Sequence, residues 1–171
     1  IVSTKKIADT LTSMGRKTTA VTVDGYVRAL KDAFILYEVG RYDVKGKQYL
    51  QSLEKYYIVD TSLRSFLLGE RTMDLGHLLE NIVYLELQRR GYKVSIGKLG
   101  TLEVDFVAQR GDEKIYYQVA ASVLDPATYE REFAPLKKIR DSYPKVVLTL
   151  DDYPMGEEGI NQQNVIEWLL N

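Results

Sequence analysis

The sequence predicts an α/β fold in which a mixed β-sheet is flanked by helices, and two observations carry this prediction. Apolar residues recur at helical spacing in some segments and at every second position in the segments between them. Residues 101–121 contain two runs of period two on either side of Gly111-Asp112, a pattern typical of a β-hairpin closed by a type II′ turn. The chain has 171 residues, 45% of them hydrophobic, enough for one domain or two small ones.

The front of the chain, residues 1–70, has the elements of a winged helix-turn-helix. Ser3 is placed to cap a helix that Gly15 ends, and Thr22 or Asp24 opens a second helix. The predicted buried stripe of that second helix is Val23, Val27, Leu30 and Phe34. Strand-like segments at 34–42 and 55–60 follow, with a hairpin tip at 45–47. Because the usual first helix is missing, we expect a truncated winged helix and a chain that is a piece of a longer protein.

Two interpretations of this front segment remain open. Residues 1–57 carry ten basic and six acidic residues, so the segment is modestly basic and compatible with phosphate contacts. In the first interpretation residues 21–33 are a DNA-recognition helix, and the phosphate-binding candidates are Arg28, Lys31, Lys45 and Lys47. In the second the winged helix is a spacer or docking surface whose lysines are only solvated. The second is favoured, because the helix has no obvious set of side chains for reading bases.

The back of the chain, residues 71–171, predicts the order helix, strand, strand, strand, helix, strand. A polar gap at 69–74 marks the expected domain boundary. The segments are a helix at 75–90, a strand at 92–98, the hairpin, a helix from Asp125-Pro126, a strand at 145–150 and a short helix within 160–171. We expect Pro135 to kink or divide the second of these helices. Lys137, Lys138 and Arg140 at its end would complement the helix dipole or, alternatively, bind nucleic acid.

Polar side chains stand in the middle of the predicted hairpin, where apolar ones are expected. A two-residue turn pairs Arg110 with Glu113, which places Asp105 opposite Gln118. Glu103 then lies on the same side, opposite Ala120. On the helix at 75–90, Glu80 shares its face with three apolar residues, so this carboxylate is predicted at the edge of the buried surface.

This arrangement resembles the PD-(D/E)XK nuclease-like, or restriction-endonuclease-like, fold, with its αβββαβ order. The matching residues are Glu80, Asp105 and the tripeptide Gln118-Val119-Ala120. More closely, the stretches TVDGYVRALKDAFILYEVGRYDVKGK, EKYYIVDTSLR, GHLLENIVYLELQRRGYKV and LEVDFVAQRGDEKIYYQVA resemble the C-terminal region of prokaryotic AAA+-type ATPases. In that family a P-loop ATPase domain precedes a winged helix and a nuclease-like domain. No GxxxxGK(S/T) occurs in this sequence, so the resemblance implies ATP and Mg²⁺ only in a separate N-terminal ATPase domain.

The resemblance implies a hydrolytic site, and the residues present depart from it. Phosphodiester hydrolysis in such folds uses Mg²⁺ or Mn²⁺ held by carboxylates, together with a lysine. Gln118 stands in place of a carboxylate and Ala120 in place of the lysine. Glu103 could replace the carboxylate and Lys98 the ammonium, which would give a catalytic set of Asp105, Glu103, Lys98 and Gln118 and metal ligands Asp105, Glu80 and Glu103. The favoured alternative is a buried polar cluster in which Gln118 donates to a carboxylate.

The sequence therefore favours a non-catalytic module that engages DNA or a partner protein and couples it to an ATPase domain. A divalent-metal nuclease and a pure oligomerisation module are the alternatives, so whether the chain is an enzyme stays open. The only histidine, His77, is expected to pack or to pair with Glu80 or Asn81. The absence of cysteine fits a cytoplasmic location, and no apolar run approaches the ~20 residues needed to span a membrane.

Overall fold

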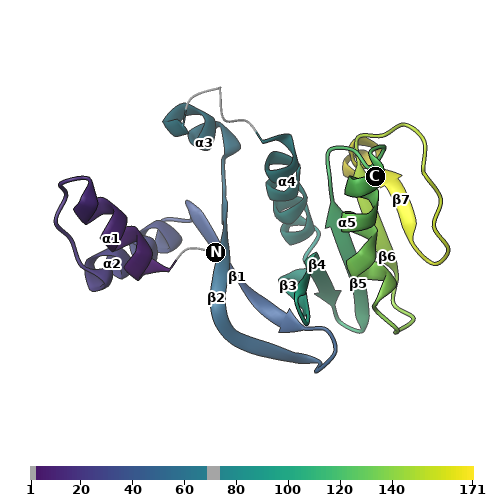
Figure 1. The fold of residues 1–171 in the computed structure, drawn as a ribbon, viewed down its shortest axis with the longest axis horizontal. Coiled ribbons are helices and arrows are strands. Elements are labelled where there is room, and N and C mark those ends of the chain that lie inside the picture. The colour runs from purple at the N-terminus through teal and green to yellow at the C-terminus, as the bar shows by residue number, and fades with distance from the viewer. Residues whose placement is uncertain (1–2, 69–73) are drawn as a thin grey trace.

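The computed structural model describes residues 3–68 and 74–171, and a mixed seven-stranded sheet runs through it with the strand order β2-β1-β3-β4-β5-β6-β7 (Figure 1). The front elements are α1 (Thr4–Ser13), α2 (Ala20–Asp32), β1 (Leu36–Asp43), β2 (Gln48–Ile58) and α3 (Thr61–Leu68). The later elements are α4 (Leu75–Arg89), β3 (Lys93–Leu99), β4 (Leu102–Arg110), β5 (Glu113–Val119), α5 (Pro126–Lys137), β6 (Lys145–Thr149), β7 (Asn161–Asn164) and α6 (Val165–Leu170). The predicted mixed α/β fold is confirmed, and so is the helix–strand order from α4 to β6.

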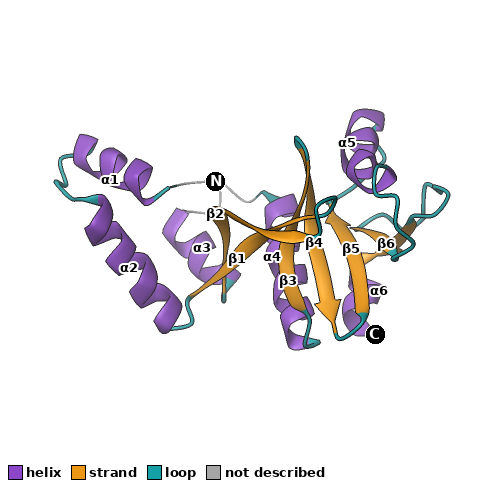
Figure 2. Ribbon diagram, turned by 90° about the horizontal axis from the view of Figure 1, so that it is seen from below, coloured by secondary structure: helices purple, strands orange, loops and turns teal. Residues whose placement is uncertain are grey.

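Helices cover both faces of this sheet (Figure 2). On one face α4 and α6 pack over a core that contains Tyr84, Phe106 and Trp168. On the other face α5 packs over a second core that contains Phe133 and Tyr116. Burial of apolar side chains on both faces stabilises the sheet as the middle layer, at roughly 25 cal/mol per Å² of apolar surface removed from water.

The sheet continues from the front of the chain into the back. β1 pairs antiparallel with β2 and parallel with β3, so the front hairpin extends the sheet. The predicted boundary at residue 70 lies outside the described residues. β2 begins at Gln48, whereas a strand was predicted only from Lys55; because β1 offers a partner along its whole length, the pairing extends to the hairpin tip.

Several details of the front helices differ from the prediction. α2 begins earlier than expected, because Thr19 caps it by accepting a hydrogen bond from the Thr22 backbone amide at 3.2 Å. Of the predicted buried stripe Val23 is buried, whereas Leu30 is 38% and Phe34 70% exposed. The stripe prediction was therefore wrong in its C-terminal half, because α2 packs mainly on α1 and leaves these side chains uncovered.

Two features of the back were not predicted correctly. Residues 161–164, Asn-Gln-Gln-Asn, form β7, a polar edge strand parallel to β6 that low strand propensity conceals. Of the two outcomes expected at Pro135, a division of the helix was wrong, because α5 is one helix that continues to Lys137. Pro135 removes one helical hydrogen bond, the one to the carbonyl of Arg131, while the buried side chains Phe133 and Leu136 on either side of it keep the helix packed on the sheet.

The hairpin register is confirmed, and it carries a bulge that the alternation did not predict. Arg110 pairs with Glu113, and Gly111 adopts the positive φ of 58° that the tight turn requires. Opposite β3, the register shifts so that Asp105 and Phe106 together face Ile96. A bulge reverses the alternation of side chains. Val104 therefore lies in the core under α5, whereas the sequence pattern placed it on the same face as Phe106.

Candidate functional site

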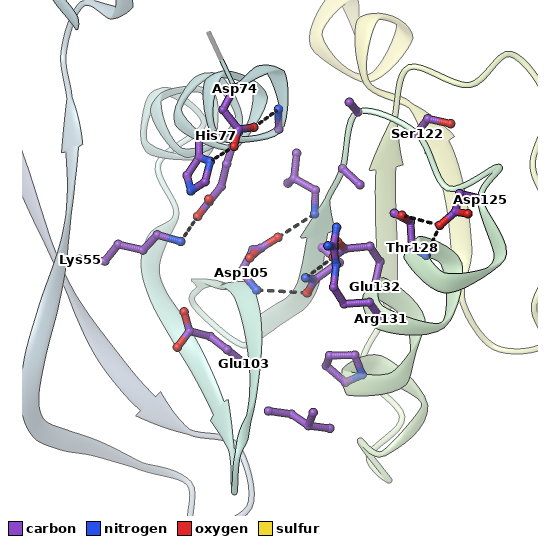
Figure 3. Close-up of a pocket in the computed structure, with 18 of the residues that line it drawn as sticks. Lys55, Asp74, His77, Glu103, Asp105, Ser122, Asp125, Thr128, Arg131 and Glu132 are labelled. Carbon is purple, nitrogen blue, oxygen red and sulfur yellow. Dashed lines mark hydrogen bonds and ion pairs between the residues drawn. The ribbon is translucent and has the colours of Figure 1, made fainter. Parts of the chain in front are cut away.

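A cavity of about 800 Å³ opens where β4 and β5 separate, between the start of α4 and the side of α5 (Figure 3). Backbone pairing between β4 and β5 ends at Phe106 and Tyr117. The polar side chains of the next residues, Asp105 and Gln118, line the cavity. The bulge at Asp105 directs its side chain here, an arrangement common beside functional sites. The predicted residues Glu80, Glu103, Asp105 and Gln118 all line the cavity.

Asp105 and Gln118 meet as the register predicted. One Asp105 carboxylate oxygen, Oδ2, accepts a hydrogen bond from the Val119 backbone amide at 2.9 Å. The Gln118 side-chain carbonyl accepts one from the Asp105 backbone amide at 3.3 Å. These two bonds cross-link β4 and β5 where the regular ladder has ended, so both side chains serve as substitutes for missing backbone pairs.

Gln118 donates its amide to a residue that the sequence analysis missed. Its Nε2 atom donates to Glu132 Oε2 at 2.7 Å, and both side chains are buried. The other Glu132 oxygen accepts from Arg131 Nε at 2.9 Å. Glu132 was recognisable by the criterion applied to Glu80, because it lies three residues after Tyr129 and four before Leu136 on the apolar stripe of α5.

The Glu80 carboxylate is bound by two side chains of β2. It accepts hydrogen bonds from the Tyr57 hydroxyl at 2.5 Å and from the Lys55 ammonium, and its side chain is only 9% exposed. The Tyr57 ring stacks on Tyr84 of α4 with centroids 4.3 Å apart, which holds the hydroxyl in place. Lys55 and Tyr57 lie two residues apart on one strand, so their common direction was predictable, but their contact with α4 was not.

The cavity is strongly acidic. Its lining includes six carboxyl groups, two of which are those of Asp74 and Asp125, against the two cations Lys55 and Arg131. Burial raises the pKa of the Asp105 carboxyl to about 8, and the neighbouring Glu80 charge adds to this effect against the Val119 hydrogen bond. Burial and Glu80 also raise the pKa of the Tyr57 hydroxyl.

The proposed substitutes Glu103 and Lys98 are engaged with one another. Glu103 Oε2 lies 3.0 Å from the buried Arg41 guanidinium and 3.5 Å from Lys98 Nζ. Ala120, at the position where the resemblance implies a lysine, is buried in the core under α5. The ammonium that does reach the cavity is that of Lys55.

These residues, as arranged, do not fit a Mg²⁺ or Mn²⁺ site. Such an ion needs several oxygen ligands that converge with free lone pairs. Here Glu80 holds Lys55 and Tyr57, and Gln118 directs its amide to Glu132. Within residues 3–68 and 74–171, no group of three or more His, Asp or Glu side chains is placed to hold a metal ion.

The remaining predicted residues lie elsewhere. His77 Nδ1 lies 2.8 Å from Asp74 at the exposed start of α4, so the predicted pairing with Glu80 or Asn81 was wrong. Lys31 forms an ion pair with Glu38. The eight residues of β1 separate α2 from the hairpin tip by about 25 Å, so Arg28 and Lys31 do not share a surface with Lys45 and Lys47.

The curated relatives of this chain are described as uncharacterized proteins. A family described as a domain of unknown function (DUF8612) matches residues 1–74. An uncharacterized protein of Haemophilus influenzae is 40% identical over 171 residues, which are 99% of this chain and 42% of that protein. An uncharacterized protein of Methanocaldococcus jannaschii is 30% identical over 141 residues, 80% of this chain and 31% of that protein. The chain thus spans less than half the length of these curated relatives. No helix among the described residues is both long and apolar enough to cross a membrane.

Proposed function

We propose that this chain is a nuclease-like module that binds nucleic acid without cutting it. The observation that supports this most directly is the mutual engagement of the polar groups at the nuclease-like positions. Glu80 is held by Lys55 and Tyr57, and Gln118 bridges the Asp105 backbone and Glu132. Each of these bonds satisfies a buried group whose desolvation would otherwise cost about 1–3 kcal/mol. Stabilisation of the fold is therefore enough to explain why these polar residues are present, without a catalytic role.

Hydrolysis of a phosphodiester needs a group that activates water and positive charge that stabilises the transition state. The carboxyl best placed to act as a base is Asp105, but the cavity around it carries five other carboxyl groups against two cations. A phosphate is repelled by such a surface. The cavity lacks the net positive charge that this chemistry requires, and Ala120 supplies none.

In this proposal the front segment is a truncated winged helix, the back is a restriction-endonuclease-like domain, and both form the C-terminal part of a longer AAA+-type ATPase. Two observations support it: the relatives are more than twice as long as the region they share with this chain, and the front helices leave apolar side chains uncovered. Tyr26 is 62% and Phe66 86% exposed. Such side chains are suited to contact with an ATPase domain or another subunit.

The test combines cleavage and binding. The purified chain is incubated with supercoiled plasmid and Mg²⁺ or Mn²⁺, and its binding to a labelled duplex is followed by anisotropy at several salt concentrations. We expect no nicking above the level of Asp105→Ala, and binding that weakens steeply with salt. Nicking that disappears in Asp105→Ala would replace the proposal with its alternative.

That alternative, a divalent-metal nuclease, is favoured by one specific observation. Glu80, Asp105 and Glu132 line the same cavity, together with the Lys55 ammonium. An oligomerisation module without nucleic-acid binding is the third possibility. It predicts no anisotropy change at any salt concentration and a concentration-dependent mass in sedimentation.

A further inference from the structure

We propose that a basic groove next to the β1–β2 tip, defined by Lys45, Lys47, Lys138 and Arg140, binds the phosphate backbone of a nucleic acid. This inference rests on the proposed function and assigns its binding site. The groove has a volume of about 820 Å³ and lies between the β1–β2 tip, the β3–β4 turn and the segment that follows α5. It unites two basic clusters that are about ninety residues apart in the sequence.

The two walls of the groove are held by the fold. Asp43 Oδ1 accepts hydrogen bonds from the backbone amides of Lys45 and Gly46, both at 3.0 Å, which fixes the tip. The Val44 amide donates to the Lys98 carbonyl at 2.9 Å and ties the tip to β3. Val44 and Ile139 are both buried in the core under α5, so the tip and the segment after α5 rest on one floor. The cations are therefore presented by ordered backbone, which lowers the entropic cost of binding.

Lys47 also adopts a φ of 53°, in the left-handed region that favours glycine. A lysine there is strained relative to glycine by roughly 1 kcal/mol. The hairpin tip thus keeps a charged side chain at a position where a glycine would be easier to accommodate. This agrees with a role for the Lys47 charge itself.

The positive charge of the groove is available to a ligand. All four cations are exposed, and none of them forms an ion pair with any residue in the described part of the chain. The acidic residue in the lining, Asp141, accepts a hydrogen bond from the Tyr116 hydroxyl at 2.6 Å and lies 4.0 Å from Lys145. The groove is thus net positive in a chain whose formal charge is −1. Phosphates are drawn to this groove and away from the acidic cavity.

A nucleic acid fits this groove better than an acidic peptide. A bound peptide usually adds a strand to a free sheet edge or anchors a side chain in an apolar pocket. β1 and β3 are already paired on both sides, and no described residue of the edge strand β2 lines the groove. The apolar floor residues Val44 and Ile139 are buried. A phosphate backbone needs only cations on the two walls, and it also follows a groove without reading its own sequence.

The experiment measures anisotropy of a fluorescein-labelled 20-base-pair DNA duplex against salt concentration. The test variant removes the groove charges through Lys45→Gln, Lys47→Gln, Lys138→Gln and Arg140→Gln. If each cation contacts one phosphate, the slope of log K against log salt becomes shallower by about 3–4, and affinity near 0.1 M salt falls roughly tenfold or more.

A matched control removes three lysines and one arginine from the exposed surface of α1 and the turn after it. Its substitutions are Lys5→Gln, Lys6→Gln, Arg16→Gln and Lys17→Gln, all at exposed positions. The control keeps the same net charge as the groove variant, so a purely non-specific charge effect lowers both equally. Thermal unfolding of both variants verifies that they are folded.

The outcomes separate the inference from the proposed function. Weaker binding in the groove variant than in the control supports the groove. Equal binding by the two variants overturns the groove while nucleic-acid binding by the chain still stands. No binding of the duplex by the unmodified chain overturns the proposed function and the groove together. Binding of a polyglutamate peptide in place of the duplex overturns the choice of nucleic acid as the ligand.

Discussion

Replacement of Asp105 by asparagine is expected to remove much of the pH dependence of stability. The pKa of the Asp105 carboxyl is raised from its usual 3.8 to about 8, so the folded state holds the proton more tightly than the unfolded state. Stability from this group is therefore complete below the unfolded pKa and is lost as the pH rises through the folded pKa. Between about pH 5 and pH 9 the linkage relation gives a loss of about 4 kcal/mol.

Because the Asp105 side chain is only partly buried and interacts electrostatically with Glu80, we expect about 2–4 kcal/mol of this loss to be observed. Asparagine keeps an oxygen that accepts the Val119 amide hydrogen bond but cannot ionise. Urea unfolding of the wild type and Asp105→Asn at the two pH values gives the free energies. Asp112→Asn, in the exposed hairpin turn, is the control and should leave the pH dependence unchanged. Equal pH dependence in the wild type and Asp105→Asn would refute the reasoning.

Three further substitutions test the network and the sheet. Gln118→Leu should lower the free energy of unfolding by about 1–3 kcal/mol, because Glu132 loses the buried amide that lies 2.7 Å from it. If the same substitution costs less in a chain that already carries Glu132→Leu, the coupling between the two side chains is confirmed. Lys55→Met should cost about 1–3 kcal/mol, because Glu80 stays buried without its cation, and Lys55→Arg should restore most of this in the same urea titration. Gly97→Ala should cost about 1–3 kcal/mol in thermal unfolding, because a Cβ there would lie 3.0 Å from side-chain atoms of two β4 valines; an unchanged melting temperature would contradict the described packing.

The features that the sequence determined are local. Turn length and alternation placed Asp105 opposite Gln118, since a two-residue loop leaves one register for the strands it joins. The caps at Ser3, Asp74 and Asp125 were likewise predictable, because each side chain accepts a hydrogen bond from an amide two or three residues further along. The mixed sheet and its flanking helices follow from these local patterns taken in order.

Only the tertiary structure determined which helices and strands contact one another. Lys55 reaches Glu80, and Glu132 reaches Gln118, only because β2 and α5 approach the same cavity from opposite sides. The bulge at Asp105 depends on the neighbouring strand β3 and has no signal in the alternation of β4 itself. The basic groove arises in the same way, because the sheet brings the hairpin tip beside the end of α5. Contacts between residues far apart in the chain depend on how the whole chain closes, and short-range periodicity carries no information about that closure.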